Sequence, residues 1–291
     1  MTRYQIMFGL LAGLGPLAAA AAQAPAPLSA QPSPEAAAAR IDAALATGEL
    51  DVAAVLIERN TSVLSPSRLL LARGEYALAA GDLDAALVVF KPLAKHPTTA
   101  ARAQLGIGLA ELRRDHTEAA MAALDLAVAA DPTLTRAWTA RAVAADRLRD
   151  WPAADIAYER ALALDPRSAA ALTNRGYSRL LRGRFAEAAA DSALALTIDP
   201  KLVPATNNLR LARAMQGDYK NAFAGSTKLS MANDLNTVGF AAMSRGDYGL
   251  AETFFTRAMQ LNPQFDRTAW DNLVYLKQLA HKPPEAGAPA R

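Results

Sequence analysis

The chain has 291 residues, enough for two ordinary domains or one elongated array, and 52% of them are apolar, which excludes general disorder. Aromatic residues make up only 6%, and much of the apolar content is alanine, which favours close-packed helices over a sheet-based core. A formal charge of +3 with scattered basic residues predicts no nucleic-acid interface, and the absence of cysteine excludes disulfides, thiolate metal sites, cysteine nucleophiles and cysteine lipidation.

The N-terminal segment, residues 1–22, has the layout of a secretory signal peptide. Arg3 supplies one early positive charge, an apolar run follows it, and small residues end the segment. We therefore expect cleavage near Ala22, a periplasmic location, and a Pro/Ala-rich extended tether over residues 23–33. The alternative is an uncleaved signal that stays as a membrane anchor, although Pro16 interrupts an apolar run that is barely long enough to span a bilayer.

Prolines end alanine-rich helical runs at a fixed interval along most of the remaining chain. Pro132, Pro166 and Pro200 are 34 residues apart, and Pro263 follows after 63 residues, which equals one repeat of 34 and one of 29. Proline ends such a run because it lacks an amide donor and biases the preceding residue away from helical geometry. A period in this range predicts a solenoid of stacked helix pairs.

The repeating unit resembles the tetratricopeptide repeat, a 34-residue helix pair with small residues at positions 8, 20 and 27, bulky apolar residues at 4, 17 and 24, and proline at 32. Residues 135–168, 169–202 and 232–265 follow this pattern closely, and weaker copies occupy residues 34–66, 67–100, 101–134 and 203–231. In residues 135–168 the pattern is carried by Trp138, Ala142, Trp151, Ala154, Tyr158, Ala161 and Pro166.

The resemblance implies an all-α fold, a right-handed superhelical solenoid of about seven helix pairs over residues 34–280. Small residues at three positions allow paired helices to approach closely, and a bulky residue fills the remaining gap. Asp266 to Ala280 is expected to be a capping helix that covers the last exposed face, and residues 281–291 are expected to be a disordered tail.

The tripeptide Arg-Gly-Asp, from Arg245 to Asp247, invites interpretation as a cell-adhesion ligand. The Gly-Asp pair recurs at Gly217 and at Gly81, in each case between the two helical runs of a repeat. Glycine allows the turn conformation and aspartate can cap the helix that follows. We therefore expect the motif to serve the fold rather than adhesion.

No catalytic or metal-binding pattern is found in the sequence. It contains no nucleophile elbow, no phosphate-binding glycine loop and no zinc-binding histidine pair. We expect a protein that is not an enzyme and that uses no cofactor or metal.

In this repeat family, six positions of each first helix point to the concave face, so the resemblance implies a peptide-binding groove there. Asparagines recur at these positions in three consecutive repeats; their amides can donate to and accept from a peptide backbone, and aromatic residues can hold apolar side chains. The predicted groove residues are Arg136, Thr139, Thr173, Asn174, Tyr177, Asn207, Asn208, Asn236 and Phe240. Further positions of this face hold Arg102, Arg113 and Arg147.

Two other interpretations of this face differ in the role that they give the asparagines. The asparagines could merely cap or solvate helices. A clamp for a chaperone-tail carboxylate needs lysine and arginine around such asparagines, but the matching sites are Thr139, Val143 and Pro204. We therefore do not expect a chaperone tail as the partner.

A second resemblance concerns the C-terminal part of the chain. The stretches "NNLRLARAMQGDY", from Asn207, and "LNTVGFAAMSRGDYGLAETFFTRAMQLNPQFDRTAWDNL", from Leu235, are similar to repeats of TadD-type proteins of the tight-adherence (Flp) pilus system. This implies an exported scaffold for assembly of the pilus secretion machine, with cell-envelope proteins such as the secretin as partners. Many members carry a lipidated cysteine that this chain lacks, so membrane association is expected only through partners or an uncleaved signal.

The alternative function is a general envelope scaffold for polysaccharide export or outer-membrane protein assembly.

The sixth repeat, residues 203–231, departs from the pattern in two ways. Arg210 lies where a small residue is expected, and the second helical run, from Lys220, is five residues short and lacks its proline. The shortened helix could leave the space that Arg210 occupies. Two outcomes stay open, a local bend or opening of the groove and a neutral deletion.

Overall fold

The computed structural model describes residues 32–261 and 267–280, which form fifteen α-helices and no strand. The predicted all-α fold is confirmed for this part of the chain. The predicted signal peptide (1–22), most of the predicted tether (23–33) and the predicted disordered tail (281–291) lie outside the described residues.

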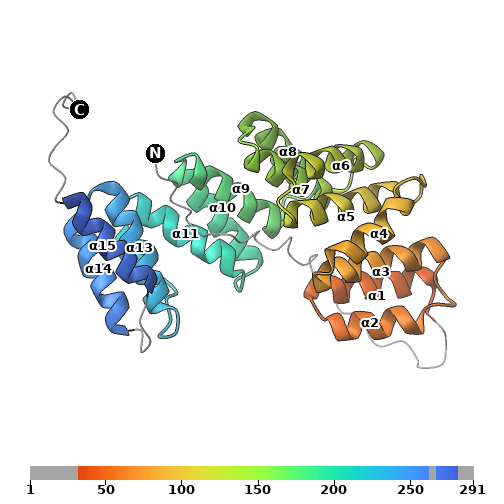
Figure 1. The fold of residues 1–291 in the computed structure, drawn as a ribbon, viewed down its shortest axis with the longest axis horizontal. Coiled ribbons are helices and arrows are strands. Elements are labelled where there is room, and N and C mark those ends of the chain that lie inside the picture. The colour runs from red at the N-terminus through yellow and green to blue at the C-terminus, as the bar shows by residue number, and fades with distance from the viewer. Residues whose placement is uncertain (1–31, 262–266, 281–291) are drawn as a thin grey trace. The chain divides into compact units, whose positions relative to one another are not determined.

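The helices correspond one by one to the two helical runs of each predicted repeat, followed by the capping helix (Figure 1). In chain order they are α1 (Pro34–Thr47), α2 (Leu50–Arg59), α3 (Pro66–Ala80), α4 (Leu83–Leu93), α5 (Ala100–Arg113), α6 (Thr117–Ala130), α7 (Thr135–Arg147), α8 (Trp151–Leu164), α9 (Ala169–Leu181), α10 (Phe185–Ile198), α11 (Val203–Met215), α12 (Tyr219–Ala222), α13 (Met231–Arg245), α14 (Tyr248–Leu261) and α15 (Arg267–Ala280).

The chain divides into two compact units, unit 1 (Met1–Arg175) and unit 2 (Gly176–Arg291), with the boundary inside α9. In unit 1, each first helix packs against its own second helix and against the next first helix, so that α1, α3, α5 and α7 form one continuous layer. Helices α2, α4 and α6 each pack between two first helices and form the other layer. In unit 2, α11, α13 and α15 contact one another in the same way.

One contact recurs in the pairs, between position 8 of the first helix and position 24 of the second. Phe90 of α4 is fully buried against Gly74, where an added Cβ atom would lie 2.7 Å from its ring. Leu124 packs on Gly108 in the same way: a Cβ atom added at Gly108 would lie 2.5 Å from the Leu124 side chain. No side chain larger than hydrogen fits at these glycines without movement of the partner.

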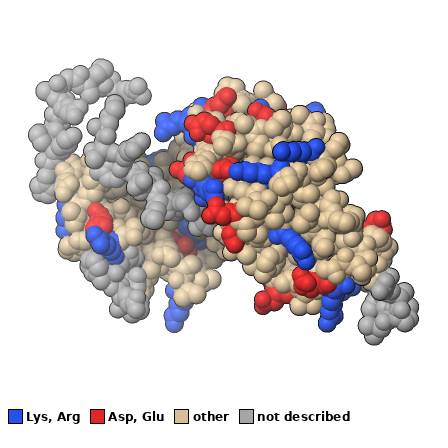
Figure 2. All heavy atoms as spheres, turned by 45° about the vertical axis from the view of Figure 1, so that its right-hand side comes forward, with Lys and Arg blue, Asp and Glu red and all other residues tan. Residues whose placement is uncertain are grey.

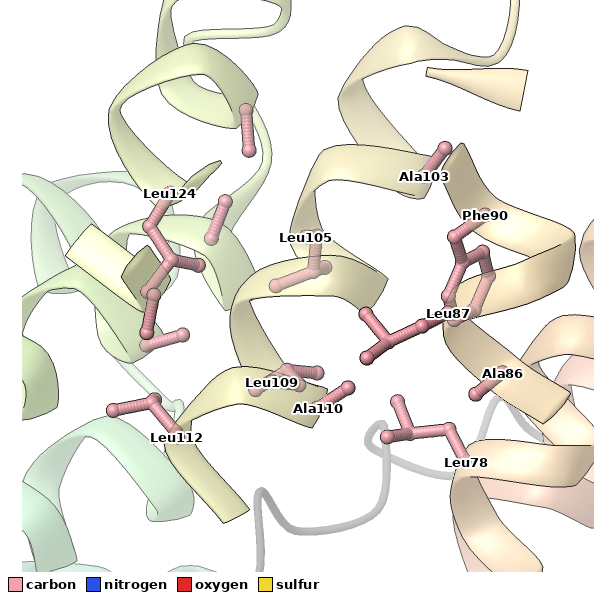
Figure 3. Close-up of a cluster of buried hydrophobic side chains, with 14 of the residues drawn as sticks. Leu78, Ala86, Leu87, Phe90, Ala103, Leu105, Leu109, Ala110, Leu112 and Leu124 are labelled. Atoms are coloured by element: carbon pink, nitrogen blue, oxygen red, sulfur yellow. The ribbon is translucent and has the colours of Figure 1, made fainter. Parts of the chain in front are cut away.

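The buried side chains around α5 show how this contact joins neighbouring pairs. Leu78 of α3, Leu87 of α4 and Ala110 of α5 point toward one another in Figure 3, and all three are buried. Phe90 also lies over Gly106 of α5, so one ring packs against two first helices. A helix pair thus buries its apolar side chains only when its neighbour is present.

The Gly-Asp turns have the predicted conformation. Gly81 and Gly217 have φ angles of 86° and 83°, in the left-handed region that glycine adopts readily. Asp82 and Asp218 accept hydrogen bonds from the amides three residues later, at 3.0 and 3.3 Å, and so cap α4 and α12. The predicted role of the Gly-Asp pair in the fold is confirmed at these two turns.

Helix α15 covers the end of unit 2, as expected of a capping helix. Leu273 and Leu276 of α15 are buried in one cluster with Met243 of α13 and Phe255 of α14. Phe255 repeats the contact seen in unit 1, because a Cβ atom added at Gly239 would lie 2.7 Å from its ring.

Two glycines of unit 2 provide a matched test of this contact. We expect Gly239→Ala to destabilise the protein by about 1–3 kcal/mol, because the new methyl group overlaps the Phe255 ring. Gly249→Ala, in α14, should be neutral or stabilising by up to about 1 kcal/mol, because nothing lies within 4 Å of its added Cβ atom. Urea unfolding followed by circular dichroism measures both variants, and equal stabilities would contradict the proposed constraint.

Candidate binding surfaces

The exposed side of α1, α3, α5 and α7 in unit 1, here named the first-helix face, carries a cluster of paired charges. The Arg102 guanidinium lies 2.7 Å from a Glu75 carboxylate oxygen and 3.1 Å from an Asp42 carboxylate oxygen. Arg68 pairs with Asp42 as well. Burial alone would lower the pKa of Arg102, but Glu75 and Asp42 outweigh it, so the pKa is raised. These charges bind one another across three first helices, which leaves little of their bonding capacity for a partner.

Arg113 and Arg147, also predicted to face the groove, serve the stacking of the pairs. Arg147 donates to the carbonyl of Leu112, in the last turn of the preceding first helix, at 2.7 Å. Arg113 donates to the carbonyl of Leu78 in the equivalent place. A cation at the C-terminal end of a helix is stabilising, since the helix dipole is negative there. The prediction missed this role, although two arginines 34 residues apart at helix ends were a visible signal.

Arg136 of α7 is the free charge of this face. It is exposed, and it makes no ion pair or hydrogen bond to any residue that the structure describes. Desolvation by the surrounding protein nevertheless lowers its pKa, as do the neighbouring Arg102 and Arg113, while Glu75 acts in the opposite direction. Because Arg136 is exposed and an arginine stays charged at any physiological pH, it can meet an anionic ligand.

The other predicted groove residues of unit 1 are buried. Thr139 and Thr173 donate from their hydroxyls to the carbonyls of Thr135 and Ala169, at 3.0 and 2.7 Å. Because both threonines are covered and bonded to their own helices, direct contact with a peptide is not expected of them. Asn174 is 6% exposed, and its Nδ2 atom has no hydrogen-bond acceptor in the described structure.

In unit 2, the predicted groove residues on α9 and α11 differ in exposure. Asn207 is exposed, and its side-chain oxygen accepts a hydrogen bond from Arg210 at 3.2 Å. Asn208 is buried. Tyr177 is half-buried and packs against a cluster that contains Leu180. Only Asn207 among them is open to solvent.

The predicted residues on α13 contact the capping helix. Asn236 accepts a hydrogen bond from the side-chain amide of Asn272 in α15 at 2.9 Å. Phe240 packs against the cluster that contains Leu276 of α15. Asn236 thus bonds to the capping helix, a role that neither interpretation of the asparagines included, and a peptide-binding role for the predicted set stays a prediction.

The Arg-Gly-Asp tripeptide is occupied by contacts within unit 2. Arg245 donates to the carbonyl of Met215 at 2.9 Å, the same contact that Arg147 makes in unit 1, and also to Asp247 at 3.3 Å. The other donor to Asp247 is the Tyr219 hydroxyl of α12. The hydrogen bond from Tyr219, together with Arg245, holds the pKa of Asp247 below its ordinary value. Both charged side chains therefore join α11, α12 and α13 rather than standing free.

The described residues show neither a metal-binding cluster nor a membrane-spanning helix. No group of three or more His, Asp or Glu residues within residues 32–261 and 267–280 is arranged to hold a metal ion. A search of the same residues finds no helix with the length and apolarity needed to cross a membrane. Figure 2 shows acidic and basic side chains scattered over one face, with no large area of one sign.

The family model that matches the chain is described as "Tetratricopeptide repeat", and it covers residues 67–134 and 139–202, which include α3 to α6 and most of α7 to α10. Tetratricopeptide repeats are thus matched within residues 67–134 and 139–202. Proteins built from tetratricopeptide repeats bind protein partners and are generally non-enzymatic scaffolds. The comparison with curated proteins finds no match.

Two solved structures show the same tetratricopeptide fold. The crystal structure of the APC/C hetero-tetramer Cut9-Hcn1 is 17% identical with a TM-score of 0.65, and the match covers 83% of this chain and 49% of the other. This chain thus spans about half the length of that protein. A tetratricopeptide repeat protein from Parabacteroides merdae ATCC 43184 is 16% identical with a TM-score of 0.51, over 84% of this chain and 98% of the other.

The Tyr219–Asp247 hydrogen bond predicts a pH-dependent stability. The lowered pKa of Asp247 stabilises the folded state above the carboxyl's unfolded pKa of about 3.9, and this contribution is lost as the pH falls through the lowered value. We expect Tyr219→Phe to be less stable than the wild type at neutral pH, with a difference that shrinks below about pH 4. Urea unfolding of both proteins at several pH values measures this difference in stability.

The control for this experiment is Tyr248→Phe, because Tyr248 is the exposed neighbour of Asp247. It should unfold like the wild type at every pH. A stability difference for Tyr219→Phe that stays constant in acid would contradict the role of Asp247.

Proposed function

We propose that this protein is a non-enzymatic scaffold that binds segments of partner proteins on the first-helix face of its repeats. The observation that carries the proposal is Arg136, an exposed residue next to Arg102 and Arg113 that pairs with no residue in the described part of the chain. Guanidinium groups bind carboxylates in a defined planar geometry, so the segment that fits this place carries Asp or Glu.

We further propose that the scaffold works in the periplasm, in assembly of a Flp/Tad-type pilus secretion system. The support is the similarity of the stretches from Asn207 and Leu235 to TadD-type repeats, together with the signal-like layout of residues 1–22. The partners are then envelope-facing proteins of the secretion machine, such as the secretin or a protein that escorts it.

Binding at Arg136 can be tested on overlapping peptides from the secretin and from other envelope components of the pilus system. We expect the peptides that bind to be enriched in Asp and Glu, and their affinity to fall with added salt. Arg136→Gln should weaken them by about 1 kcal/mol, because it removes one charge-assisted contact. Fluorescence anisotropy with the full chain measures the affinities.

Arg167→Gln is the matched control for this test, since Arg167 is an exposed arginine in the turn after α8. It should bind peptides like the wild type. Bound peptides without acidic residues, or equal effects of the two substitutions, would contradict a site at Arg136.

The cellular role predicts a specific phenotype. Deletion of the gene should abolish surface pili while pilin is still synthesised, because a scaffold acts on assembly and not on supply. The Arg136→Gln protein should reproduce part of this defect at normal protein level. Electron microscopy of pili and immunoblots of pilin provide the measurement.

A deletion strain with normal pili and a defect in polysaccharide export or outer-membrane protein assembly would instead support the general envelope scaffold.

A further inference from the structure

The sixth helix pair leaves a pocket of about 270 Å³ in unit 2. Its second helix, α12, has 4 residues, whereas α10 and α14 have 14 each. The space that a full second helix would fill beside α11 is therefore open. Leu196 of α10, Leu209 of α11 and Ala222 of α12 form its apolar wall.

Two polar residues stand where a glycine and a bulky apolar residue pack together in the repeats that begin at residues 67, 101 and 232. Position 8 of this repeat is Arg210, and position 24, counted from Val203, is Ser226; the repeat of residues 169–202 also has a serine there, Ser192. Both are left with unused hydrogen-bonding capacity, because Arg210 Nε and Ser226 Oγ are buried without a partner among the described residues. Buried polar atoms without partners are rare in folded proteins, and a ligand is one explanation of their presence.

Arg210 lies in the wall of this pocket and is 5% exposed. Its Nη1 atom is 3.0 Å from an Asp234 carboxylate oxygen and 3.2 Å from the Asn207 side-chain oxygen. These contacts fix the guanidinium, and Asp234 balances its charge. The Nε donor of this pocket-lining residue is left without an acceptor among the described residues.

Arg213, one turn further along α11, gives the pocket a net positive charge. It lines the pocket, and its Nη1 atom donates to the carbonyl of Asn221 at 3.0 Å. No carboxylate is among the residues that line the pocket, so the charge of Arg213 is not balanced there. Thr206 adds a hydroxyl to the same wall.

We infer that this pocket is a carboxylate-binding subsite, in which Arg213 and the Nε donor of Arg210 bind the two oxygens and the leucine wall holds a short aliphatic group. Guanidinium donors match a planar carboxylate, and the volume accommodates a group of a few heavy atoms. A small free carboxylate and the C-terminal residue of a peptide offer the same chemistry. The subsite lies beside α11 and α12, and the inference does not depend on the proposed function.

The experiment follows the arginine Nε–H signals of the full, isotope-labelled chain by NMR while three probes are added. Butanoate tests a small free carboxylate, N-acetyl-leucine tests a chain terminus, and N-acetyl-leucine amide is the uncharged control. We expect saturable shifts of the Arg210 and Arg213 signals with the carboxylates and none with the amide. Similar affinities for the two carboxylates indicate a small free ligand, and about tenfold tighter binding of N-acetyl-leucine indicates a peptide terminus.

Substitutions test whether Arg210 and Arg213 bind the carboxylate. Arg213→Gln should weaken binding about tenfold, because it removes the unbalanced charge. Lys220→Gln removes an exposed charge from the same repeat and should leave the affinity unchanged. Arg210→Lys retains a cation for Asp234 but lacks the Nε donor, so it should weaken binding while circular dichroism shows a folded protein.

Three outcomes would overturn the inference. They are the absence of saturable shifts with both carboxylates, equal shifts with the acid and its amide, and an unchanged affinity in Arg213→Gln.

Discussion

The fold depends on how closely the two helices of a pair can approach. A glycine or alanine on the first helix brings its backbone against a large side chain of the second, as Gly74 and Gly239 do with Phe90 and Phe255. Because Phe90 also reaches Gly106 in the next pair, the same contact fixes both the pair and its stacking. This explains how a chain with few aromatic residues and many alanines forms a buried core.

This constraint is why the helix pairs could be predicted from the sequence, whereas the contacts of the polar residues could not. The spacing of small and bulky residues is a local property, and it located the helix pairs and the turns at Gly81 and Gly217. The hydrogen bonds of a polar side chain, by contrast, depend on which acceptors and donors the neighbouring repeat places next to it. Arg113 and Arg147 bind carbonyls of the preceding pair; their recurrence after 34 residues was visible in the sequence, but the carbonyl acceptors in the neighbouring repeat were not.

The same dependence applies in unit 2. Asn236 was predicted from its position in the repeat, but its amide oxygen is bonded to Asn272, which lies 36 residues later. The departure of the sixth repeat was visible in the sequence, since Arg210 stood at a position for small residues. Ser226 Oγ also lacks a hydrogen-bond partner among the described residues. The sequence could not predict this, because the chain is no longer helical at Ser226.

The arginine-to-carbonyl contacts give the array a direction. In each case the donor belongs to the later repeat and the acceptor to the last turn of the earlier first helix, as with Arg147 and Leu112, or Arg245 and Met215. During synthesis, an emerging repeat therefore lacks its charged helix-end partner until the following first helix has been made. Removing the last repeat therefore takes the donor from a helix end that remains, whereas removing the first repeat takes the acceptor and leaves the donor in place.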